Sequence, residues 1–124
     1  MGEGMKDKPR VLVVDDDDEI LAMLRRALTR HGFEVESAES AEGALALADT
    51  QPFDAALVDL VMPGRDGRSL TDALRRQFPG MPIGLLTGYA HSPLISDAER
   101  SGVRLFSKPV IIQEIVDFLT TEIA

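Results

Sequence analysis

Two hydrophobic patterns alternate along the chain, one typical of buried strands and one typical of amphipathic helices. Short continuous apolar runs, such as residues 11–14, predict strands that are covered on both faces. After each run, apolar residues recur at helical spacing, as they do at Ile20, Leu24 and Leu28. The sequence contains five such strand–helix units in succession. We expect the strands at residues 11–14, 33–37, 54–60, 83–86 and 103–106.

Glycine, serine and proline mark where the helices begin and end. Gly32 is expected to adopt a left-handed conformation after the first helix, and Ser40 is expected to cap the start of the second. Ser92 and Pro93 indicate the start of a fourth helix, which Gly102 ends. The strict alternation predicts a doubly wound α/β domain, in which a parallel sheet carries helices on both faces. Ligands bind such sheets at the carboxyl ends of the strands.

Composition narrows the class of protein. The 124 residues suit one domain, and the absence of cysteine excludes disulfides and thiolate metal sites. The net charge of −8 argues against direct nucleic-acid binding through a general basic surface. No apolar stretch is long enough to span a membrane, so we expect no membrane association. We expect a flexible polar segment at residues 1–9, one domain at residues 10–124 and a cytoplasmic location.

The first strand ends abruptly in four consecutive aspartates, residues 15–18. Because adjacent carboxylates repel one another, the run either binds a hard cation such as Mg²⁺ or opens the next helix, where aspartate is favoured. Polar residues follow other predicted strands as well. The carboxyl ends of parallel strands share one edge of the sheet, so these residues should meet there. The set at that edge is Asp15, Asp16, Asp59, Thr87 and Lys108.

These side chains suit phosphoryl chemistry. Three carboxylates repel strongly without a cation, and Mg²⁺ accepts a few carboxylates together with water and phosphate oxygens. The Lys108 ammonium and the Thr87 hydroxyl are able to hold the oxygens of an anion, and a phosphoryl group is the anion that pairs naturally with Mg²⁺. A carboxylate can also act as a nucleophile and form an acyl phosphate. Asp59 is the candidate for that role, because it stands alone at the end of its strand.

The chain resembles the receiver domains of two-component response regulators, from about Arg10 to Ile123. The matching segments stand in the family's order and at compatible spacing: VLVVDDDDEIL, ALVDLVMPGRDG, LLTGYA and FSKP. The resemblance implies a flavodoxin-like (βα)5 fold with strand order 2-1-3-4-5. It also implies a bacterial phosphoprotein that works in phosphorelay signalling.

The resemblance assigns roles to the residues at the sheet edge. Asp59 matches the phosphoacceptor, which takes a phosphoryl group from a sensor histidine kinase or a phosphotransfer protein. Asp16 and Asp59 match direct Mg²⁺ ligands, with the backbone carbonyl of Val61 as a third. Asp15 matches a ligand that acts through water or by orienting the site. Lys108 matches the lysine that pairs with the phosphoryl oxygens.

Further expectations follow from the same resemblance. Thr87 matches the switch hydroxyl that moves onto the phosphoryl group. The Lys108–Pro109 peptide bond is cis in similar receivers. Asp17 and Asp18 match no family role, and we interpret them as residues that start the first helix.

The chain departs from the family at one position. Leu105 stands where many receivers have an aromatic residue whose rotation reports phosphorylation. Phe106 is adjacent, but neighbouring strand residues point to opposite faces. We therefore expect a weaker or differently relayed change at the face formed by the last two helices and the fifth strand. Val61 and Tyr89 should flank the phosphoryl group, where they either restrict the attacking water or simply cover the loop.

The leading hypothesis is a phosphorylation-controlled switch that assists its own phosphorylation and dephosphorylation and is not an enzyme for a separate substrate. A small Mg²⁺-dependent phosphohydrolase, a flavodoxin-like cofactor module and a phosphorylation-independent interaction module are the alternatives. The second lacks a glycine-rich phosphate loop after the first strand. Whether the receiver is free-standing or part of a hybrid histidine kinase or longer regulator stays open. The family also implies a possible homodimer through the last two helices and fifth strand.

Overall fold

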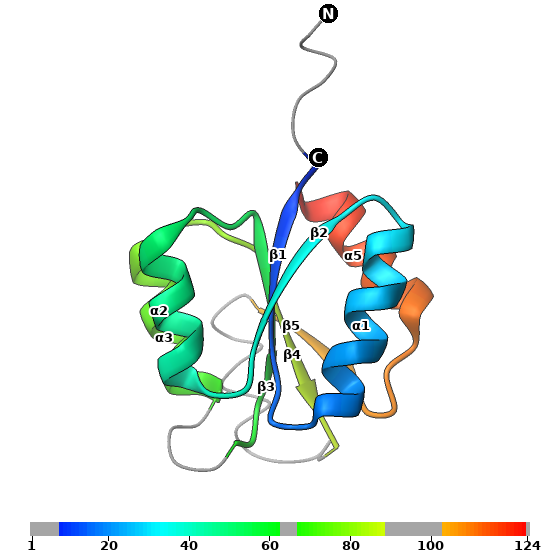
Figure 1. The fold of residues 1–124 in the computed structure, drawn as a ribbon, viewed down its shortest axis with the longest axis horizontal. Coiled ribbons are helices and arrows are strands. Elements are labelled where there is room, and N and C mark those ends of the chain that lie inside the picture. Colours follow the sequence, from blue (N-terminus) through cyan, green and yellow to red (C-terminus); the bar gives the residue numbers. More distant parts are fainter. Residues whose placement is uncertain (1–7, 63–66, 89–102, 124) are drawn as a thin grey trace, which may run out of the picture.

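Within the described residues, 8–62, 67–88 and 103–123, five parallel strands form one sheet in the computed structural model (Figure 1). The strands are β1 (Arg10–Val14), β2 (Glu34–Ala38), β3 (Ala55–Asp59), β4 (Ile83–Thr87) and β5 (Arg104–Ser107). They lie in the order β2-β1-β3-β4-β5, and each adjacent pair is parallel. The predicted doubly wound, flavodoxin-like fold with strand order 2-1-3-4-5 is confirmed.

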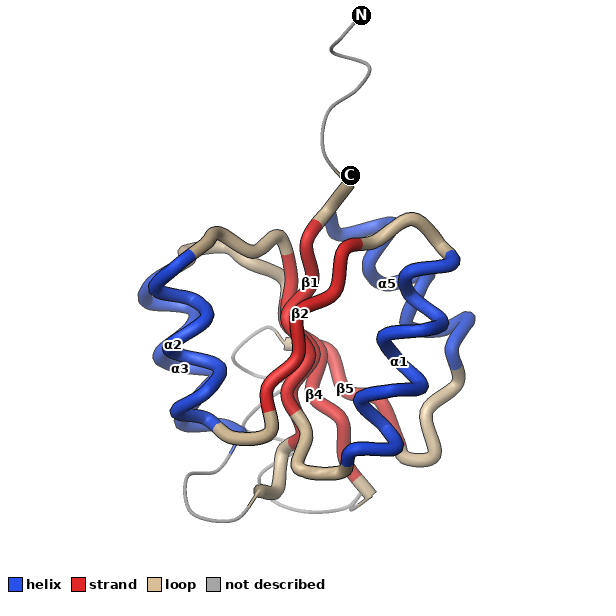
Figure 2. Tube along the Cα trace, viewed as in Figure 1, coloured by secondary structure: helices blue, strands red, loops and turns tan. Residues whose placement is uncertain are grey.

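The described helices cover both faces of the sheet. They are α1 (Asp18–Arg30), α2 (Ala41–Thr50), α3 (Gly67–Gln77) and α5 (Ile112–Ile123). In Figure 2, α2 and α3 lie on one side of the strands, and α1 and α5 lie on the other. The helix predicted at residues 92–102 lies outside the described residues. Among those that are described, no helix has the length and apolar character that crossing a bilayer requires.

Successive residues of the central strands point into two different hydrophobic cores. On β1, Leu12 and Val14 contribute to the core beneath α2 and α3, whereas Val11 and Val13 contribute to the core beneath α1 and α5. All residues of β3 and β4 are buried. Burial on both faces explains why these strands are continuous apolar runs, because each face of the sheet is covered by helices.

The predicted helix ends are also confirmed where the structure describes them. Asp17 caps α1, because its side chain accepts hydrogen bonds from the backbone N–H groups of Glu19 (2.9 Å) and Ile20 (3.4 Å). Gly32 has a φ of 93°, the left-handed conformation that favours glycine. Ser40 caps α2 through a 3.0 Å bond from the backbone N–H of Gly43.

Candidate functional site

The candidate site lies at the carboxyl edge of the sheet. Asp59 and Thr87 are the last residues of β3 and β4, and Asp15 and Lys108 directly follow β1 and β5. The pairing registers hold these ends level, since Asp59 is opposite Leu86 and Thr87 is opposite Ser107. A backbone hydrogen bond from Lys108 N to Thr87 O (2.8 Å) connects the ends of the adjacent strands β4 and β5. The structure thus places Asp15, Asp59, Thr87 and Lys108 at the edge where the sequence analysis expected them, and their roles stay predictions.

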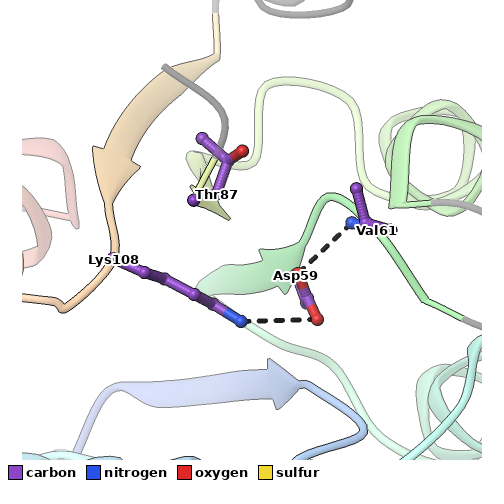
Figure 3. Close-up of a pocket in the computed structure, with 5 residues that line it drawn as sticks. Asp59, Val61, Thr87 and Lys108 are labelled. Carbon is purple, nitrogen blue, oxygen red and sulfur yellow. Dashed lines mark hydrogen bonds and ion pairs between the residues drawn. The ribbon is translucent and has the colours of Figure 1, made fainter. Parts of the chain in front are cut away.

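Lys108 links two carboxylates that come from different strands. Its Nζ lies 3.1 Å from Oδ2 of Asp15 and 3.5 Å from Oδ2 of Asp59. The Lys108 side chain is about one quarter exposed, whereas the side chains of Asp15 and Asp59 are buried. Figure 3 shows the ammonium reaching across to the Asp59 carboxylate, which also accepts a 3.2 Å hydrogen bond from the backbone N–H of Val61.

Asp15 is the most deeply buried charged group of the site, with no exposed surface. Its Oδ1 accepts a 2.9 Å hydrogen bond from the backbone N–H of Asp17. Its Oδ2 makes no hydrogen bond with the described part of the chain, although the Lys108 ammonium lies nearby. The Lys108 ammonium at 3.1 Å therefore provides the electrostatic stabilisation of this buried oxygen, and a bound cation would add to it.

The charges at the site shift the pKa values of Asp59 and Lys108. Burial, followed by the nearby charge of Asp15, raises the pKa of Asp59 to about 6, although Lys108 and the Val61 N–H act in the opposite direction. For Lys108, burial disfavours the charged form, but the interactions with Asp15 and Asp59 outweigh it and raise the pKa above its usual value. Lys108 therefore remains an ammonium at neutral pH.

The acidic residues are arranged as a possible metal site. Asp15, Asp16 and Asp59 each offer an oxygen, and these oxygens all lie within 4.8 Å of one another. Oxygens bound to one Mg²⁺ at about 2.1 Å are about 3–4 Å apart, so a small closure of the cluster would accommodate the ion. Asp16 is exposed and faces water, which Mg²⁺ usually retains as part of its coordination. This set of hard oxygen donors, which includes the buried Oδ2 of Asp15, fits a divalent cation.

A pocket of 410 Å³ opens beside the Asp59 carboxylate. Asp59, Val61, Thr87, Gly88 and Lys108 line it, and Figure 3 shows the Lys108 ammonium directed toward the Asp59 carboxylate. Thr87 is buried, and its place at the end of β4 puts it beside the same opening. The pocket thus combines an anionic oxygen, an ammonium and a hydroxyl within one small volume.

The residues that were expected to modulate the site lie in different surroundings. Val61 lines the pocket and is 52% exposed. Tyr89 lies outside the described residues. Leu105 is half-buried and packs with the core beneath α2 and α3, whereas Phe106 packs in the opposite core, as the alternation of strand side chains predicted. The Lys108–Pro109 peptide bond is cis, as the resemblance implied.

Two glycines near the site were given no role by the sequence. Gly88 lines the pocket immediately after Thr87. Gly67, at the start of α3, lies against the end of β3: a Cβ there would overlap the carbonyl oxygen of Asp59 and would lie 2.8 Å from the Leu60 Cα. Its N–H donates to Leu60 O (2.9 Å). The second glycine of the GRDG segment, Gly67, could have indicated this contact in the sequence, because a close approach of two backbones requires a residue without a side chain.

The chain belongs to the response regulator receiver domain family, whose model matches residues 11–120. It is 37% identical over 109 residues to the transcriptional regulatory protein PrrA of Mycobacterium tuberculosis, covering 87% of this chain and 47% of that protein. The signal receiver domain of an HD domain-containing protein from Pseudomonas fluorescens has a TM-score of 0.86 at 29% identity, covering 95% of this chain and 88% of that one. The chemotaxis protein CheY4 of Vibrio cholerae has a TM-score of 0.83 at 30% identity, covering 92% and 98%.

Membership of this family defines the class of function. Receiver domains are signalling domains that interact with histidine kinases or phosphotransfer proteins, and phosphorylation and Mg²⁺ dependence are general among them. The chain spans about half the length of the curated relatives it matches. The output activity of those longer proteins is therefore not transferred to this chain.

Proposed function

We propose that Asp59 accepts a phosphoryl group from a phosphohistidine of a sensor kinase or phosphotransfer protein, and that the chain then switches conformation to control a partner. One observation carries the proposal: the Asp59 carboxylate opens onto the pocket while Lys108 stands 3.5 Å from its Oδ2 and two further carboxylates lie beside it. A nucleophile, a cation for the transferred group and a metal-binding set thus meet at one point.

The transfer requires an ionised Asp59. One carboxylate oxygen attacks phosphorus, the new O–P bond forms as the N–P bond breaks, and the electron pair of that bond returns to the imidazole nitrogen of the donor. With a pKa of about 6, Asp59 is mostly ionised at neutral pH. The Lys108 ammonium would pair with the phosphoryl oxygens, and the Thr87 hydroxyl would donate to one of them. The product is an acyl phosphate on Asp59.

Mg²⁺ is the cation that this site suits best. Asp16 and Asp59 would bind it directly with the Val61 backbone carbonyl, and Asp15 would act through water or by orienting the cluster. When bound, the ion neutralises carboxylate charge and helps to hold the phosphoryl oxygens in place. The assignment of each ligand stays a prediction. It is supported by the proximity of the three aspartates and by the buried Asp15 Oδ2, to which no hydrogen bond is assigned within the described chain.

Intact-mass measurement tests the phosphoacceptor. With acetyl phosphate and Mg²⁺, the wild type should gain the mass of one phosphoryl group, whereas Asp59→Asn should gain none. Asp54→Asn is the matched control, because Asp54 directly precedes the opposite end of β3 and its substitution should leave labelling intact. Labelling should also fail in EDTA. Modification of Asp59→Asn to the wild-type extent would refute the proposal by placing the phosphoryl group on another residue. An unmodified wild type would refute it and favour a phosphorylation-independent interaction module.

Val61 and Tyr89 are proposed to slow hydrolysis of the acyl phosphate by limiting the approach of water. The exposure of Val61 at the pocket wall supports this role for one of the pair. The measurement is the dephosphorylation rate of Tyr89→Ala and Val61→Ala, each compared with the wild type. An unchanged rate in either variant removes that residue from the proposal.

The identity of the partner is a separate question. A free-standing switch and a receiver that passes the phosphoryl group on within a phosphorelay both require Asp59 to be labelled. Homodimer formation and the cytoplasmic location stay predictions, as does the absence of direct nucleic-acid or membrane binding, for which the net charge of −8 is the support. Sedimentation of the protein with and without beryllofluoride would show whether phosphorylation drives dimer formation.

A further inference from the structure

Two aromatic rings connect the last strand to the last helix. The rings of Phe106 on β5 and Phe118 on α5 have centroids 5.3 Å apart at an interplanar angle of 71°, an edge-to-face contact. Both residues are buried. The Phe106 ring also lies over Gly84 on β4, where an added Cβ would be only 2.8 Å from its Cε2 atom. The ring therefore fills space that exists because β4 has no side chain at that point.

Strand β5 connects Phe106 to the proposed phosphorylation site. Only Ser107 separates it from Lys108, whose ammonium is shared between Asp15 and Asp59. Ser107 is paired with Thr87, and the Lys108 N–H donates to the Thr87 carbonyl. A change in the position of Lys108 or Thr87 therefore acts on the segment of backbone that holds the Phe106 ring.

The far side of the aromatic pair reaches the surface. Arg104 and Phe118 line a groove of 270 Å³ between β5 and α5. The Arg104 guanidinium lies 5.2 Å from the centroid of the Phe106 ring, a cation–π arrangement. Phe106 thus contacts one residue from each wall of the groove. The remaining lining residues are Glu114, Asp117, Thr121 and Glu122.

We propose that Phe106 and Phe118 couple the phosphorylation site to this β5–α5 groove, in place of an aromatic residue at position 105. The inference rests on the proposed function of Asp59 and goes beyond it by assigning the relay. Leu105 lies on the other face of β5, where it packs with the core beneath α2 and α3. Because Phe106 is confined between Gly84 and Phe118, a shift of Ser107 and Lys108 moves Phe118 and Arg104 instead of being absorbed by the ring.

The test measures by NMR how the chemical shifts of the α5 amides change when beryllofluoride and Mg²⁺ are added. In the wild type, amides at Asp59 and Lys108 should shift, and so should those from Glu114 to Glu122. Phe106→Leu should keep the shifts at Asp59 and Lys108 but reduce those on α5 by about twofold or more. The matched control is Leu105→Ala, which changes the neighbouring residue on the opposite face and should leave the α5 response intact.

Two further variants keep the test decisive if Phe106→Leu folds poorly. Phe118→Leu breaks the same contact from the helix, and Gly84→Ala displaces the ring without altering it. Each should reduce the α5 response, and Phe106→Leu with Phe118→Leu should reduce it no further than one change alone. An undiminished α5 response in the folded variants, or its loss in Leu105→Ala, would overturn the relay alone. A wild type without shifts at Asp59 and Lys108 would instead refute the proposed function and the relay with it.

Discussion

The charged groups at the two edges of the sheet differ in their exposure to solvent and in their pairing. At the amino edge, the backbone N–H of Arg10 donates to the Asp54 carboxylate (2.8 Å), and its guanidinium donates to Glu34 Oε1 (3.0 and 3.2 Å). These groups are exposed or half-exposed. At the carboxyl edge, Asp15 and Asp59 share the Lys108 ammonium, and Asp16 adds a third carboxylate close by.

The difference separates charge that holds the fold together from charge that is kept for a ligand. The charged groups at the amino edge are solvated, so their ion pairs contribute little to the free energy of unfolding. The carboxyl edge keeps three like charges close together, two of them buried, and this repulsion destabilises the protein in the absence of a bound divalent cation. Functional sites commonly accept such a cost in stability.

The largest effect is expected where the carboxyl edge is packed most tightly. Gly67→Ala should lower the free energy of unfolding by about 3 kcal/mol, because the new methyl group would overlap the Asp59 carbonyl oxygen. Urea denaturation measures the loss. Gly88→Ala is the control, since a Cβ there meets nothing within 4 Å and stability should be nearly unchanged. Equal stabilities for the two variants would show that the contact at Gly67 relaxes freely.

Neutralising Asp59 should stabilise the protein in the absence of metal. Its folded pKa of about 6 lies above the usual value of 3.8, so the folded state binds the proton more tightly. The associated stability is fully present below pH 3.8 and is lost as the pH rises through about 6. At pH 7, Asp59→Asn should therefore be more stable than the wild type by about 1–3 kcal/mol.

Denaturation curves of Asp59→Asn and the wild type at several pH values check this expectation. The stability difference should be small near pH 4 and should grow toward pH 7. Asp54→Asn at the amino edge should show no such gain. A difference between Asp59→Asn and the wild type that is independent of pH would contradict the assigned cause.

Magnesium should relieve the same repulsion. At ten times its dissociation constant, Mg²⁺ should add about 1.4 kcal/mol to the stability of the wild type. The gain should be much smaller in Asp59→Asn and reduced in Asp16→Asn. Thermal unfolding with Mg²⁺ and with EDTA measures it, and Asp54→Asn should respond like the wild type. A full gain in Asp59→Asn would place the ion elsewhere.

The smallest effect is expected at the amino edge. Glu34→Gln removes the charge that pairs with the Arg10 guanidinium and should cost about 0.2–1 kcal/mol, because the pair is solvated. The cost should decrease as salt is added. Glu36→Gln, on the same strand, is the comparison. A loss above that range that persists in high salt would mean that both edges depend on charge to a similar degree.

Local patterns in the sequence were sufficient for most of the architecture. Continuous apolar runs predicted the buried strands, and Asp17, Gly32 and Ser40 marked helix ends that the structure shows at those positions. These signals are readable because caps and periodicity depend on residues only a few positions apart. The topological rule for parallel sheets then placed Asp15, Asp59 and Lys108 at one edge without any knowledge of distances.

The sequence by itself thus determined the fold class and which polar side chains gather at the carboxyl edge of the sheet. Only the tertiary structure decided the complete burial of Asp15 Oδ2, the raised pKa of Asp59 and the close approach of Gly67 to the end of β3. It also decided that Phe106 packs over Gly84 and against Phe118. These features depend on register and side-chain packing between elements far apart in the chain, and no local pattern encodes such contacts.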